Sequence, residues 1–418
     1  MPDPIVIVGG GLAGAFAAQT LRDEGYTDPL IIMGEEPERP YERPPLSKGY
    51  LMGAQERDKV FVHPAGWYAE HDVALLTGVR AIAVDPSAHT LTTAGGDHLR
   101  YTKLLLATGS TPRSLPVPGN ELDGVLSLRT LADADRLAPR LVRDARVVIV
   151  GGGWIGLEIA AAARTAGAQV TIIETTAMPL QRVLGRDVAQ VFVDLHHANG
   201  VRILTGRTVQ ALHGTGSVEA VELADGERLD ADLVVVGIGV WPNVELAAAA
   251  GLEVRHGVVT DESMRTSAPD IYAAGDIAEF QHRLLGRPLH IEHWANARKS
   301  AITAAKAMLG QPASHDSVPY FYTDQYDLGM EYRGHAEPGG YDRVVFRGSP
   351  RLTEGKTPSF MAFWTRQARV LAAMNVNTWD DGEHLERLVR AGHAGQPVDL
   401  DQLADPAIAL VDALRSDG

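Results

Sequence analysis

Two glycine-rich motifs have the residue types and the spacing to bind nucleotides. Each follows the pattern G-x-G-x-x-G, and the glycines that form them are Gly9, Gly11, Gly14, Gly151, Gly153 and Gly156. In a dinucleotide site the first glycine permits a tight turn, the second lets the backbone approach the pyrophosphate, and the third lets helix and strand pack closely. The pyrophosphate then meets the N–H groups of the helix N-terminus. Two such motifs predict two dinucleotide sites; the alternative is glycine turns in unrelated α/β units.

An acidic residue closes each of these two units. Glu35 follows the first motif and Glu174 the second, where a carboxylate accepts hydrogen bonds from ribose hydroxyls. Glu174 favours NAD over NADP, because a 2′-phosphate beside this carboxylate would meet like-charge repulsion. Arg182 follows closely enough in sequence to turn back toward such a phosphate, so NADP stays the alternative.

The first motif shows signs of FAD in particular. An apolar run at residues 104–106 leads into Ala-Thr-Gly with Thr108 and Gly109, and residues 266–276 form a strand that ends in Gly-Asp with Asp276. A carboxylate at the carboxyl end of a parallel strand can bind a ribityl hydroxyl, and a helix after it can present N–H groups to flavin or phosphate. Asp276 fits the N-cap of such a helix equally well.

The elements that must position these residues occur twice in the same order. Each motif follows a β-branched run, at residues 5–8 and 147–150, and precedes an alanine-rich helical stretch, at residues 15–21 and 157–164. A glycine placed to end the helix and a second apolar strand follow in both. The uncharged segment 4–21 is long enough for a membrane span, but its clustered glycines favour a turn after a buried strand, and no basic start of a signal peptide precedes it. We therefore expect a cytoplasmic protein.

Composition excludes several classes of protein. The chain has 418 residues, enough for two or three domains, and 45% of them are hydrophobic and 22% charged. Its net charge of −15 argues against a general nucleic-acid binder. It has no cysteine, which excludes disulfides, cysteine-ligated metals and a thiol nucleophile. The electrons of any redox reaction must therefore reside on a bound organic cofactor or another metal.

Taken together, these motifs resemble the two-dinucleotide flavoprotein reductases related to glutathione reductase. Three further segments are similar to the NADH-dependent ferredoxin reductases that serve bacterial oxygenases: Arg-Pro-Tyr-Glu-Arg-Pro-Pro-Leu-Ser-Lys at residues 39–48, Glu-His-Trp-Ala-Asn-Ala at residues 292–297, and Pro-Tyr-Phe-Tyr-Thr-Asp-Gln-Tyr at residues 319–326. The resemblance covers the whole chain. It implies an α/β fold with two Rossmann-like domains, for FAD and NAD, and a C-terminal α+β domain.

The resemblance also implies which residues hold the cofactors. Those expected at FAD are Gly9, Gly11, Gly14, Glu35, Arg43, Lys48, Thr108, Gly109, Asp276 and Trp294. Those expected at NADH are Gly151, Gly153, Trp154, Gly156, Glu174, Arg182 and Gly239. Trp154 is expected either to cover the flavin until the nicotinamide displaces it or to be a packing residue. Two positions depart from the family: Tyr322 stands where tryptophan is frequent, and Met178 where arginine is frequent.

Lys48 and Glu158 are the expected catalytic residues. In the resembling family the lysine of the Pro-Pro-Leu-Ser-Lys segment pairs with an acid on the second nucleotide helix, beside the flavin N5. A cation there favours the electron-rich reduced flavin, and the acid fixes the lysine. The alternative is a solvated glutamate on a helix face and a surface lysine.

Two clusters of potential metal ligands are interpreted without a metal. His290, Glu292 and His293 have suitable side chains, but the resemblance assigns Glu292 to the flavin and no third ligand cluster is nearby, so no metal is expected. His196 and His197 precede Asn-Gly, a predicted helix end, and are expected in a capped surface turn.

The expected FAD domain is discontinuous, at residues 1–112 and 245–318, and an NAD domain at residues 113–244 is inserted into it. Residues 319–418 form the expected C-terminal α+β interface domain, a small sheet with helices. Its predicted elements are strands at residues 343–346, 359–365 and 368–376 and a helix at residues 382–391.

The expected reaction passes electrons from NADH through FAD to a one-electron acceptor. The acceptor implied by the resemblance is a small iron–sulfur ferredoxin that feeds a monooxygenase or dioxygenase. Such ferredoxins are usually acidic, so we expect a local cationic patch with Arg298, Lys299 and Lys306 as candidates. An ordinary solvated helix face explains these three residues equally well.

Three alternative functions share part of this pattern. A related disulfide reductase, peroxidase or NADH oxidase needs a redox cysteine, and the chain has none. A reductase of rubredoxin, a quinone or a radical shares all the motifs and stays open. A flavoprotein of the apoptosis-inducing type shares the segment 43–48, but the net charge of −15 and the lack of a targeting leader disfavour it.

Overall fold

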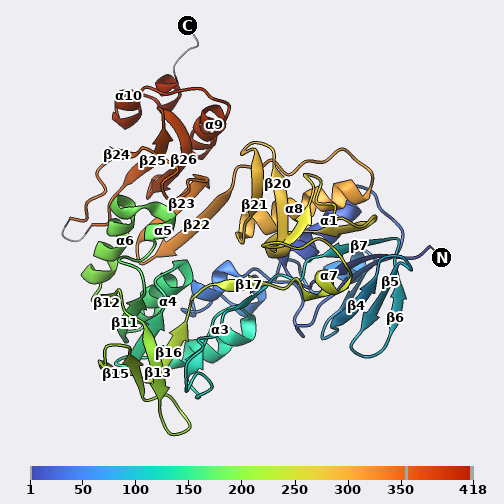
Figure 1. Ribbon diagram of the computed structural model, residues 1–418, viewed down its shortest axis with the longest axis horizontal. Coiled ribbons are helices and arrows are strands. Elements are labelled where there is room, and N and C mark those ends of the chain that lie inside the picture. The colour runs from blue at the N-terminus through green and yellow to red at the C-terminus, as the bar shows by residue number, and fades with distance from the viewer. Residues whose placement is uncertain (1, 354–355, 415–418) are drawn as a thin grey trace. The chain divides into compact units, whose positions relative to one another are not determined.

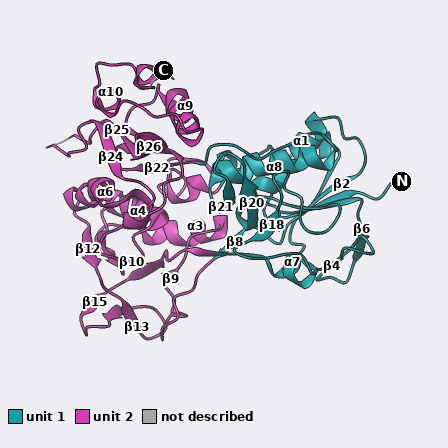
Figure 2. Ribbon diagram, turned by 45° about the horizontal axis from the view of Figure 1, so that its top comes forward, with its two compact units in different colours: residues 1–42, 57–111, 241–319 teal, residues 43–56, 112–240, 320–418 magenta. Residues whose placement is uncertain are grey.

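The structure is a computed structural model that describes residues 2–353 and 356–414 (Figure 1). The chain divides into two compact units, each gathered from segments distant in sequence (Figure 2). Unit 1 comprises residues 1–42, 57–111 and 241–319, and unit 2 comprises residues 43–56, 112–240 and 320–418. The division into three domains expected from the sequence stays a prediction.

Unit 1 is built on a parallel sheet with the strand order β19-β7-β1-β2-β3. Its strands are β1 (Ile5–Val8), β2 (Leu30–Met33), β3 (Val73–Leu76), β7 (Lys103–Leu106) and β19 (Ile271–Ala273). All four residues of β1 are apolar and buried, as expected for a central strand of a sheet covered on both faces. Helices α1 (Leu12–Asp23) and α8 (Trp294–Met308) pack side by side (Figure 1).

Smaller elements complete unit 1. Two further sheets have the orders β4-β5-β6 and β18-β20-β21. Their strands are β4 (Ala81–Asp85), β5 (Thr90–Thr93), β6 (His98–Arg100), β18 (Val258–Thr260), β20 (Ala278–His282) and β21 (Arg287–His290). The short helices are η2 (Arg57–Lys59), α2 (Trp67–Glu70), α7 (Glu245–Ala249) and η4 (Gly275–Ile277).

Unit 2 contains a second parallel sheet, with the order β12-β11-β10-β16-β9. Its strands are β9 (Val125–Leu126), β10 (Arg146–Val150), β11 (Gln169–Glu174), β12 (Arg202–Thr205) and β16 (Leu233–Val236). A small antiparallel sheet is formed by β13 (Val209–His213), β14 (Ala220–Leu223) and β15 (Arg228–Asp230). The helices are η1 (Pro44–Ser47), α3 (Leu131–Leu137), η3 (Ala138–Arg140), α4 (Trp154–Thr165), α5 (Gln181–Leu184) and α6 (Arg186–Ala198). The short strands β8 (Ser110–Pro112) and β17 (Val240–Pro242) lie where the chain passes from one unit to the other.

The C-terminal part of unit 2 is an antiparallel sheet with the order β22-β23-β26-β25-β24. Its strands are β22 (Tyr320–Gln325), β23 (Leu328–Gly334), β24 (Arg343–Gly348), β25 (Phe360–Arg366) and β26 (Arg369–Val376). The helices are α9 (Gly382–His393), which packs on β26, then α10 (Leu400–Ala404) and η5 (Leu410–Ala413). The three predicted strands and the predicted helix are present, whereas β22 and β23 carry no strand prediction. Tyr332 and Trp364 of this sheet share one core with Leu157 and Phe192 of the parallel part.

The predicted α/β fold class, with two Rossmann-like sheets and a C-terminal α+β part, is confirmed. The segment 4–21 forms β1, the glycine turn and most of α1 rather than one long helix. Among the residues that the structure describes, no helix has both the length and the apolar character needed to cross a membrane.

Candidate active site

The first glycine motif forms the turn between β1 and α1. Gly9 has a φ of 135°, and a Cβ there would lie 2.0 Å from the carbonyl oxygen of Ala107. A Cβ at Gly14 would lie 2.1 Å from the carbonyl oxygen of Gly9, whereas a Cβ at Gly11 would meet no atom within 4 Å. The first and third glycines are therefore required by the fold itself. Gly11 is the N-cap of α1 and supplies no side-chain cap, so the helix N–H groups remain available to a pyrophosphate.

The second motif repeats this geometry between β10 and α4. A Cβ at Gly151, whose φ is 106°, would lie 2.3 Å from the carbonyl oxygen of Gly237. A Cβ at Gly156 would lie 2.2 Å from the carbonyl oxygen of Gly151, and one at Gly153 would meet no atom within 4 Å. Gly153 is likewise an N-cap without a side-chain cap. Both turns thus fit a bound dinucleotide for the same physical reason.

The acid of the second unit is held by its own turn. Glu174 ends β11, and its carboxylate accepts hydrogen bonds from the backbone N–H of Gly152 at 2.8 Å and from the N–H and hydroxyl of Thr176 at 2.7 and 2.8 Å. Burial by itself would raise the pKa of Glu174, but these hydrogen bonds outweigh it and lower the pKa below the ordinary value. The side chain therefore carries its charge at neutral pH, which disfavours a 2′-phosphate beside it. In the first unit Glu35 is exposed, 3.7 Å from Arg80.

Of the remaining predicted FAD residues of unit 1, Trp294 is the first residue of α8, and the other three lie at the carboxyl ends of β7 and β19. The Thr108 hydroxyl donates to the carbonyl oxygen of Asn243 at 2.7 Å, and Gly109 has a φ of 69°. Asp276 is buried and accepts a hydrogen bond from the Ser110 hydroxyl at 2.9 Å. Asp276 lies inside η4, whose N-cap is Ala274, so the alternative of an N-cap role is wrong. A strand, β20, follows where a helix was expected. The strand β20 belongs to a different sheet from β19 and pairs with β18 and β21.

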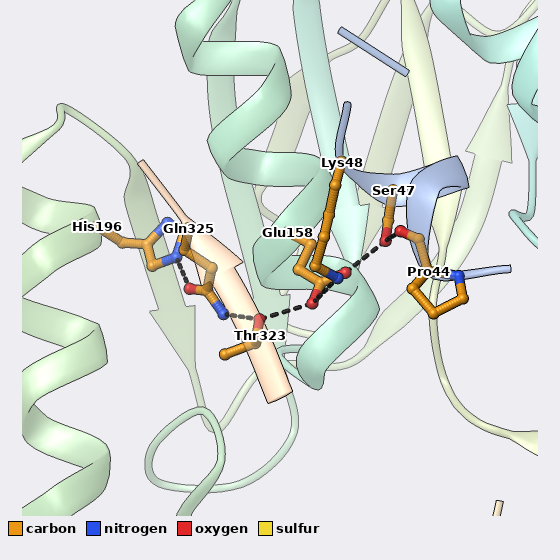
Figure 3. A network of polar contacts seen from close by, with 7 residues as sticks. All are labelled: Pro44, Ser47, Lys48, Glu158, His196, Thr323 and Gln325. Atoms are coloured by element: carbon orange, nitrogen blue, oxygen red, sulfur yellow. Dashed lines mark hydrogen bonds and ion pairs between the residues drawn. The ribbon is translucent and has the colours of Figure 1, made fainter. Parts of the chain in front are cut away.

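Lys48 and Glu158 form an ion pair in unit 2, in which Glu158 is buried and Lys48 is partly buried (Figure 3). The Lys48 Nζ lies 2.6 Å from Glu158 Oε1, and the two side chains are 14% and 3% exposed. Glu158 lies on α4, whose N-cap is the second glycine of the motif, Gly153, and Lys48 directly follows the η1 turn. The Ser47 hydroxyl donates to Glu158 Oε2. The alternative of a solvated glutamate and a surface lysine is therefore excluded.

A line of buried polar side chains leads away from this pair (Figure 3). The Thr323 hydroxyl lies 2.6 Å from Glu158 Oε1, and Gln325 Nε2 lies 3.2 Å from Thr323 Oγ1. Gln325 Oε1 lies 2.9 Å from His196 Nε2. The prediction that His196 and His197 occupy a capped surface turn is wrong for His196. Both residues lie on α6, and His196 is fully buried because its side of the helix faces β22.

Comparison with known proteins places this geometry in a family. The family model described as pyridine nucleotide-disulphide oxidoreductase matches residues 3–301, and the one described as reductase C-terminal matches residues 320–414. The chain belongs to the pyridine nucleotide-disulphide oxidoreductase family. Members of this family and its ferredoxin–NAD(+) reductases use FAD and NAD(H), so the two predicted cofactors are confirmed. With no cysteine, this member has no redox disulfide.

Individual relatives are similar to this chain over almost its whole length. The ferredoxin reductase subunit of 5,5′-dehydrodivanillate O-demethylase from Sphingobium sp. is 39% identical over 99% of this chain and 98% of its own length. The ferredoxin–NAD(+) reductase component of the anthranilate 1,2-dioxygenase system from Burkholderia cepacia is 38% identical, with 98% of each chain covered. A solved structure of the covalent putidaredoxin reductase–putidaredoxin complex has a TM-score of 0.91 and 37% identity, with 98% of each chain covered. The resemblance to oxygenase-associated ferredoxin reductases is therefore confirmed.

The other residues expected at the family's NADH site lie in unit 2. Trp154 is the first residue of α4 and packs edge-on against Phe192 and beside Phe321, with ring centroids 5.5 and 5.2 Å away. This supports its packing role, and the gating role stays a prediction. Gly239 has a φ of 99°, and its carbonyl accepts from the Arg113 N–H. Arg182 is exposed on α5.

Arg43, Tyr322 and Met178 also lie in unit 2. Arg43 donates to the carbonyl oxygen of Arg129. The Tyr322 ring centroid lies 5.5 Å from Lys48 Nζ, and Met178 is buried in the core of the unit. The roles of Arg43 and Lys48 toward FAD stay predictions.

The histidines considered as metal ligands have protein partners. His290 Nε2 lies 2.6 Å from the carbonyl oxygen of Asp276, and its Nδ1 lies 3.9 Å from Glu292. Within residues 2–353 and 356–414 no group of three or more acidic or histidine side chains has a geometry suited to a metal.

Four residues of the site carry no role in the sequence-based prediction: Ser47, Thr323, Gln325 and His196. The first three lie inside two of the three segments that carry the family resemblance, residues 39–48 and 319–326. Their place in those segments was a usable signal, but nothing in the sequence links them to His196, which is 129 positions from Gln325.

Proposed function

We propose that the chain is an NADH-dependent reductase whose electrons pass through FAD to a small iron–sulfur ferredoxin, which supplies a monooxygenase or dioxygenase. When bound, FAD would supply the hydride-accepting group and release electrons one at a time. The observation that carries the proposal is the combination of two dinucleotide turns with no cysteine. Electrons then leave from the flavin itself, as a one-electron acceptor requires. The reductase would act in the cytoplasm, where NADH is available.

Lys48 and Glu158 are the proposed catalytic pair. A buried ammonium group near the flavin N5 would stabilise the negative charge that the ring gains on reduction. Glu158 holds the Lys48 ammonium at 2.6 Å, so its position is set before the reaction. Removal of water from the pair strengthens this electrostatic effect.

Arg298, Lys299 and Lys306 are the proposed docking residues for an acidic ferredoxin. All three lie on α8. Arg298 is exposed, and its guanidinium carbon lies 4.7 Å from the centroid of the Phe16 ring. Lys306 contributes less free charge, because its Nζ lies 3.2 Å from Glu24. Arg298 and Lys299 are adjacent on α8, and we propose that they form the centre of the patch.

Steady-state transfer of electrons from NADH to cytochrome c through an added ferredoxin tests both proposals. Transfer that needs the ferredoxin supports the function, whereas reduction of rubredoxin or a quinone alone would identify another acceptor. For docking, Arg298→Glu/Lys299→Glu should raise the KM for ferredoxin about tenfold at low salt, with the difference fading as salt screens the charges. The matched control is Arg100→Glu/Arg283→Glu, which changes the net charge equally at two exposed arginines of the same unit. Equal KM values for the two double variants would reject the patch.

A further inference from the structure

Three polar side chains beyond the ion pair are buried without carrying a charge. Thr323, Gln325 and His196 are exposed by 0%, 1% and 0%. Gln325 and Thr323 come from β22, and His196 comes from α6. Burying such groups is costly unless every donor and acceptor is satisfied. The chain maintains all three in one hydrogen-bonded line that ends on Glu158 (Figure 3).

The chemistry of each group sets the direction of this line. The Glu158 carboxylate, paired with the Lys48 ammonium, can only accept, so the one hydroxyl hydrogen of Thr323 points to it. Thr323 Oγ1 must then accept from the Gln325 amide, which turns Gln325 Oε1 toward His196. The opposite amide orientation would put the Gln325 amide oxygen 3.2 Å from Thr323 Oγ1, whose only hydrogen is already given to Glu158, so two acceptors would face each other. The orientation of Gln325 is therefore determined.

His196 closes the line from the other end. Because Gln325 Oε1 accepts, His196 Nε2 carries the hydrogen, and Nδ1 accepts from the Tyr326 hydroxyl at 3.3 Å. Burial lowers the pKa of His196 to about 4; the hydrogen bond to Gln325 opposes this shift, and the nearby His197 adds to it. The ring therefore carries one hydrogen at neutral pH. Every donor from Tyr326 onward thus points toward Glu158. Hydrogen bonds aligned in this way polarise one another and strengthen the last one.

We propose that Thr323, Gln325 and His196 are positioning residues that fix the carboxylate of Glu158 and, through it, the ammonium of Lys48. The inference rests on the proposed function of that pair. Without Thr323, the carboxylate of Glu158 would be held only by Ser47 and Lys48, which are neighbours in one segment of the chain. The Thr323 hydroxyl fixes the carboxylate from β22, so the C-terminal sheet takes part in aligning the pair. Such alignment acts on the rate of the reaction and not on the affinity for NADH.

The first test is reduction of the FAD-loaded protein by NADH in anaerobic stopped flow. Thr323→Val keeps the shape of the side chain and removes the hydroxyl, and it should lower the limiting rate about tenfold with the Kd for NADH within about twofold. Thr323→Ser keeps the hydroxyl and should retain the rate within about twofold. A wild-type rate in Thr323→Val, or an equal loss in both variants, would overturn the inference.

The second test asks whether Gln325 acts through Thr323. Gln325→Leu should lower the limiting rate about threefold in the wild-type background and should cause no further loss in Thr323→Val, because the hydroxyl it orients is gone. Equal losses in both backgrounds would show two independent packing defects and contradict the proposal. Retention of FAD, read from its visible absorbance, verifies that each variant is folded. If the wild-type protein itself is not reduced by NADH, the proposed function fails, and the inference fails with it.

A third readout does not depend on activity. Nitrogen-15 NMR of the ring nitrogens distinguishes the two neutral tautomers of histidine, and His196→Gln assigns the signal. We expect the tautomer with hydrogen on Nε2 in the wild type and in Thr323→Ser. Hydrogen on Nδ1 would reverse the direction of the line and overturn the inference even if the rates behaved as expected.

Discussion

Glu158 illustrates how one residue becomes suited to its role through its neighbours. Its two carboxylate oxygens meet the Lys48 ammonium and the hydroxyls of Ser47 and Thr323. A buried ion pair adds little net stability, but removing one partner leaves a charge in a poorly solvated place, at a cost of about 3–5 kcal/mol. The pair is therefore better explained by the alignment of a cation than by a contribution to folding.

Lys48→Ala should slow reduction of the bound FAD by NADH at least about tenfold and change the Kd for NADH by no more than about threefold, because it removes charge stabilisation of the reduced ring and no NADH contact. The variant should also lose stability, since Glu158 stays buried without its cation. Lys48→Ala/Glu158→Gln is the matched control: urea unfolding should show recovered stability, while stopped flow should show no recovered rate. An unchanged rate in Lys48→Ala would reject the catalytic role.

At this scale the sequence predicts residues whose identity a local motif requires. The glycines and Glu174 follow from spacing alone, and Lys48 and Glu158 follow from the family segment that contains the lysine. For His196 the sequence predicts a capped surface turn, because the residue precedes Asn-Gly, a predicted helix end. Its burial depends on β22, which lies more than a hundred positions later in the chain. No local pattern contains that information.

The two nucleotide turns and β22 show what can be predicted for whole elements. The sequence predicts β1–α1 and β10–α4, because each consists of a β-branched run, a glycine turn and an alanine-rich helix. The sequence does not predict β22, because the buried side chains of this strand include the polar residues Thr323 and Gln325. Strand prediction relies on alternating apolar residues, and a strand that turns polar groups inward to serve a site lacks that signal.

Gly153→Ala and Gly156→Ala should separate the two roles of glycine in such a turn, which are room for a pyrophosphate and close packing of the backbone. A methyl group at Gly156 would lie 2.2 Å from the carbonyl oxygen of Gly151, so this variant should lose about 1–3 kcal/mol of stability in urea unfolding. Gly153 has a φ of −80° and open space around its Cβ position, so its variant should keep the wild-type stability. The same methyl group would obstruct a pyrophosphate, and NADH affinity should fall about tenfold or more.

The pair of variants is its own control, because both add one methyl group to the same turn. Fluorescence titration with NADH and urea unfolding in the absence of nucleotide measure the two effects separately. Loss of stability in Gly153→Ala would contradict the open space around this position. Unaltered NADH affinity would show that the second glycine does not accommodate a ligand.

Across the whole molecule, each compact unit contains a buried neutral histidine. His196 lies in unit 2, and His315 lies in unit 1, where its Nε2 is 2.8 Å from Asn296 Oδ1. Burial lowers the pKa of His196 to about 4 and that of His315 to about 3, the latter aided by the nearby His282 and Lys299. In the unfolded chain both titrate near the ordinary value of 6.5. Both units therefore share one source of acid sensitivity.

The direction in which stability changes with pH follows from proton binding. Below pH 6.5 these two histidines bind protons in the unfolded chain but stay neutral in the native protein. The free energy of unfolding therefore falls as the pH decreases toward 4. Each histidine should cost about 2 kcal/mol at pH 5 relative to pH 8. Carboxylates with a lowered pKa, such as Glu174, lose their contribution only below the ordinary value of 4.5. Protonation also relieves repulsion within a chain of net charge −15, an opposing effect that salt screens.

Urea unfolding of the apoprotein between pH 8 and 5 in physiological salt measures this cost. His196→Gln and His315→Gln should each lose stability at pH 8, where a buried hydrogen bond is altered, and each should depend less on pH than the wild type by about 2 kcal/mol. Because the two residues lie in different units, each variant serves as the control for the other. If the units unfold separately, each substitution should flatten the pH dependence of its own transition only. An unaltered pH dependence in both variants would contradict the assignment of neutral buried histidines and, for His196, the hydrogen-bond direction that leads to Glu158.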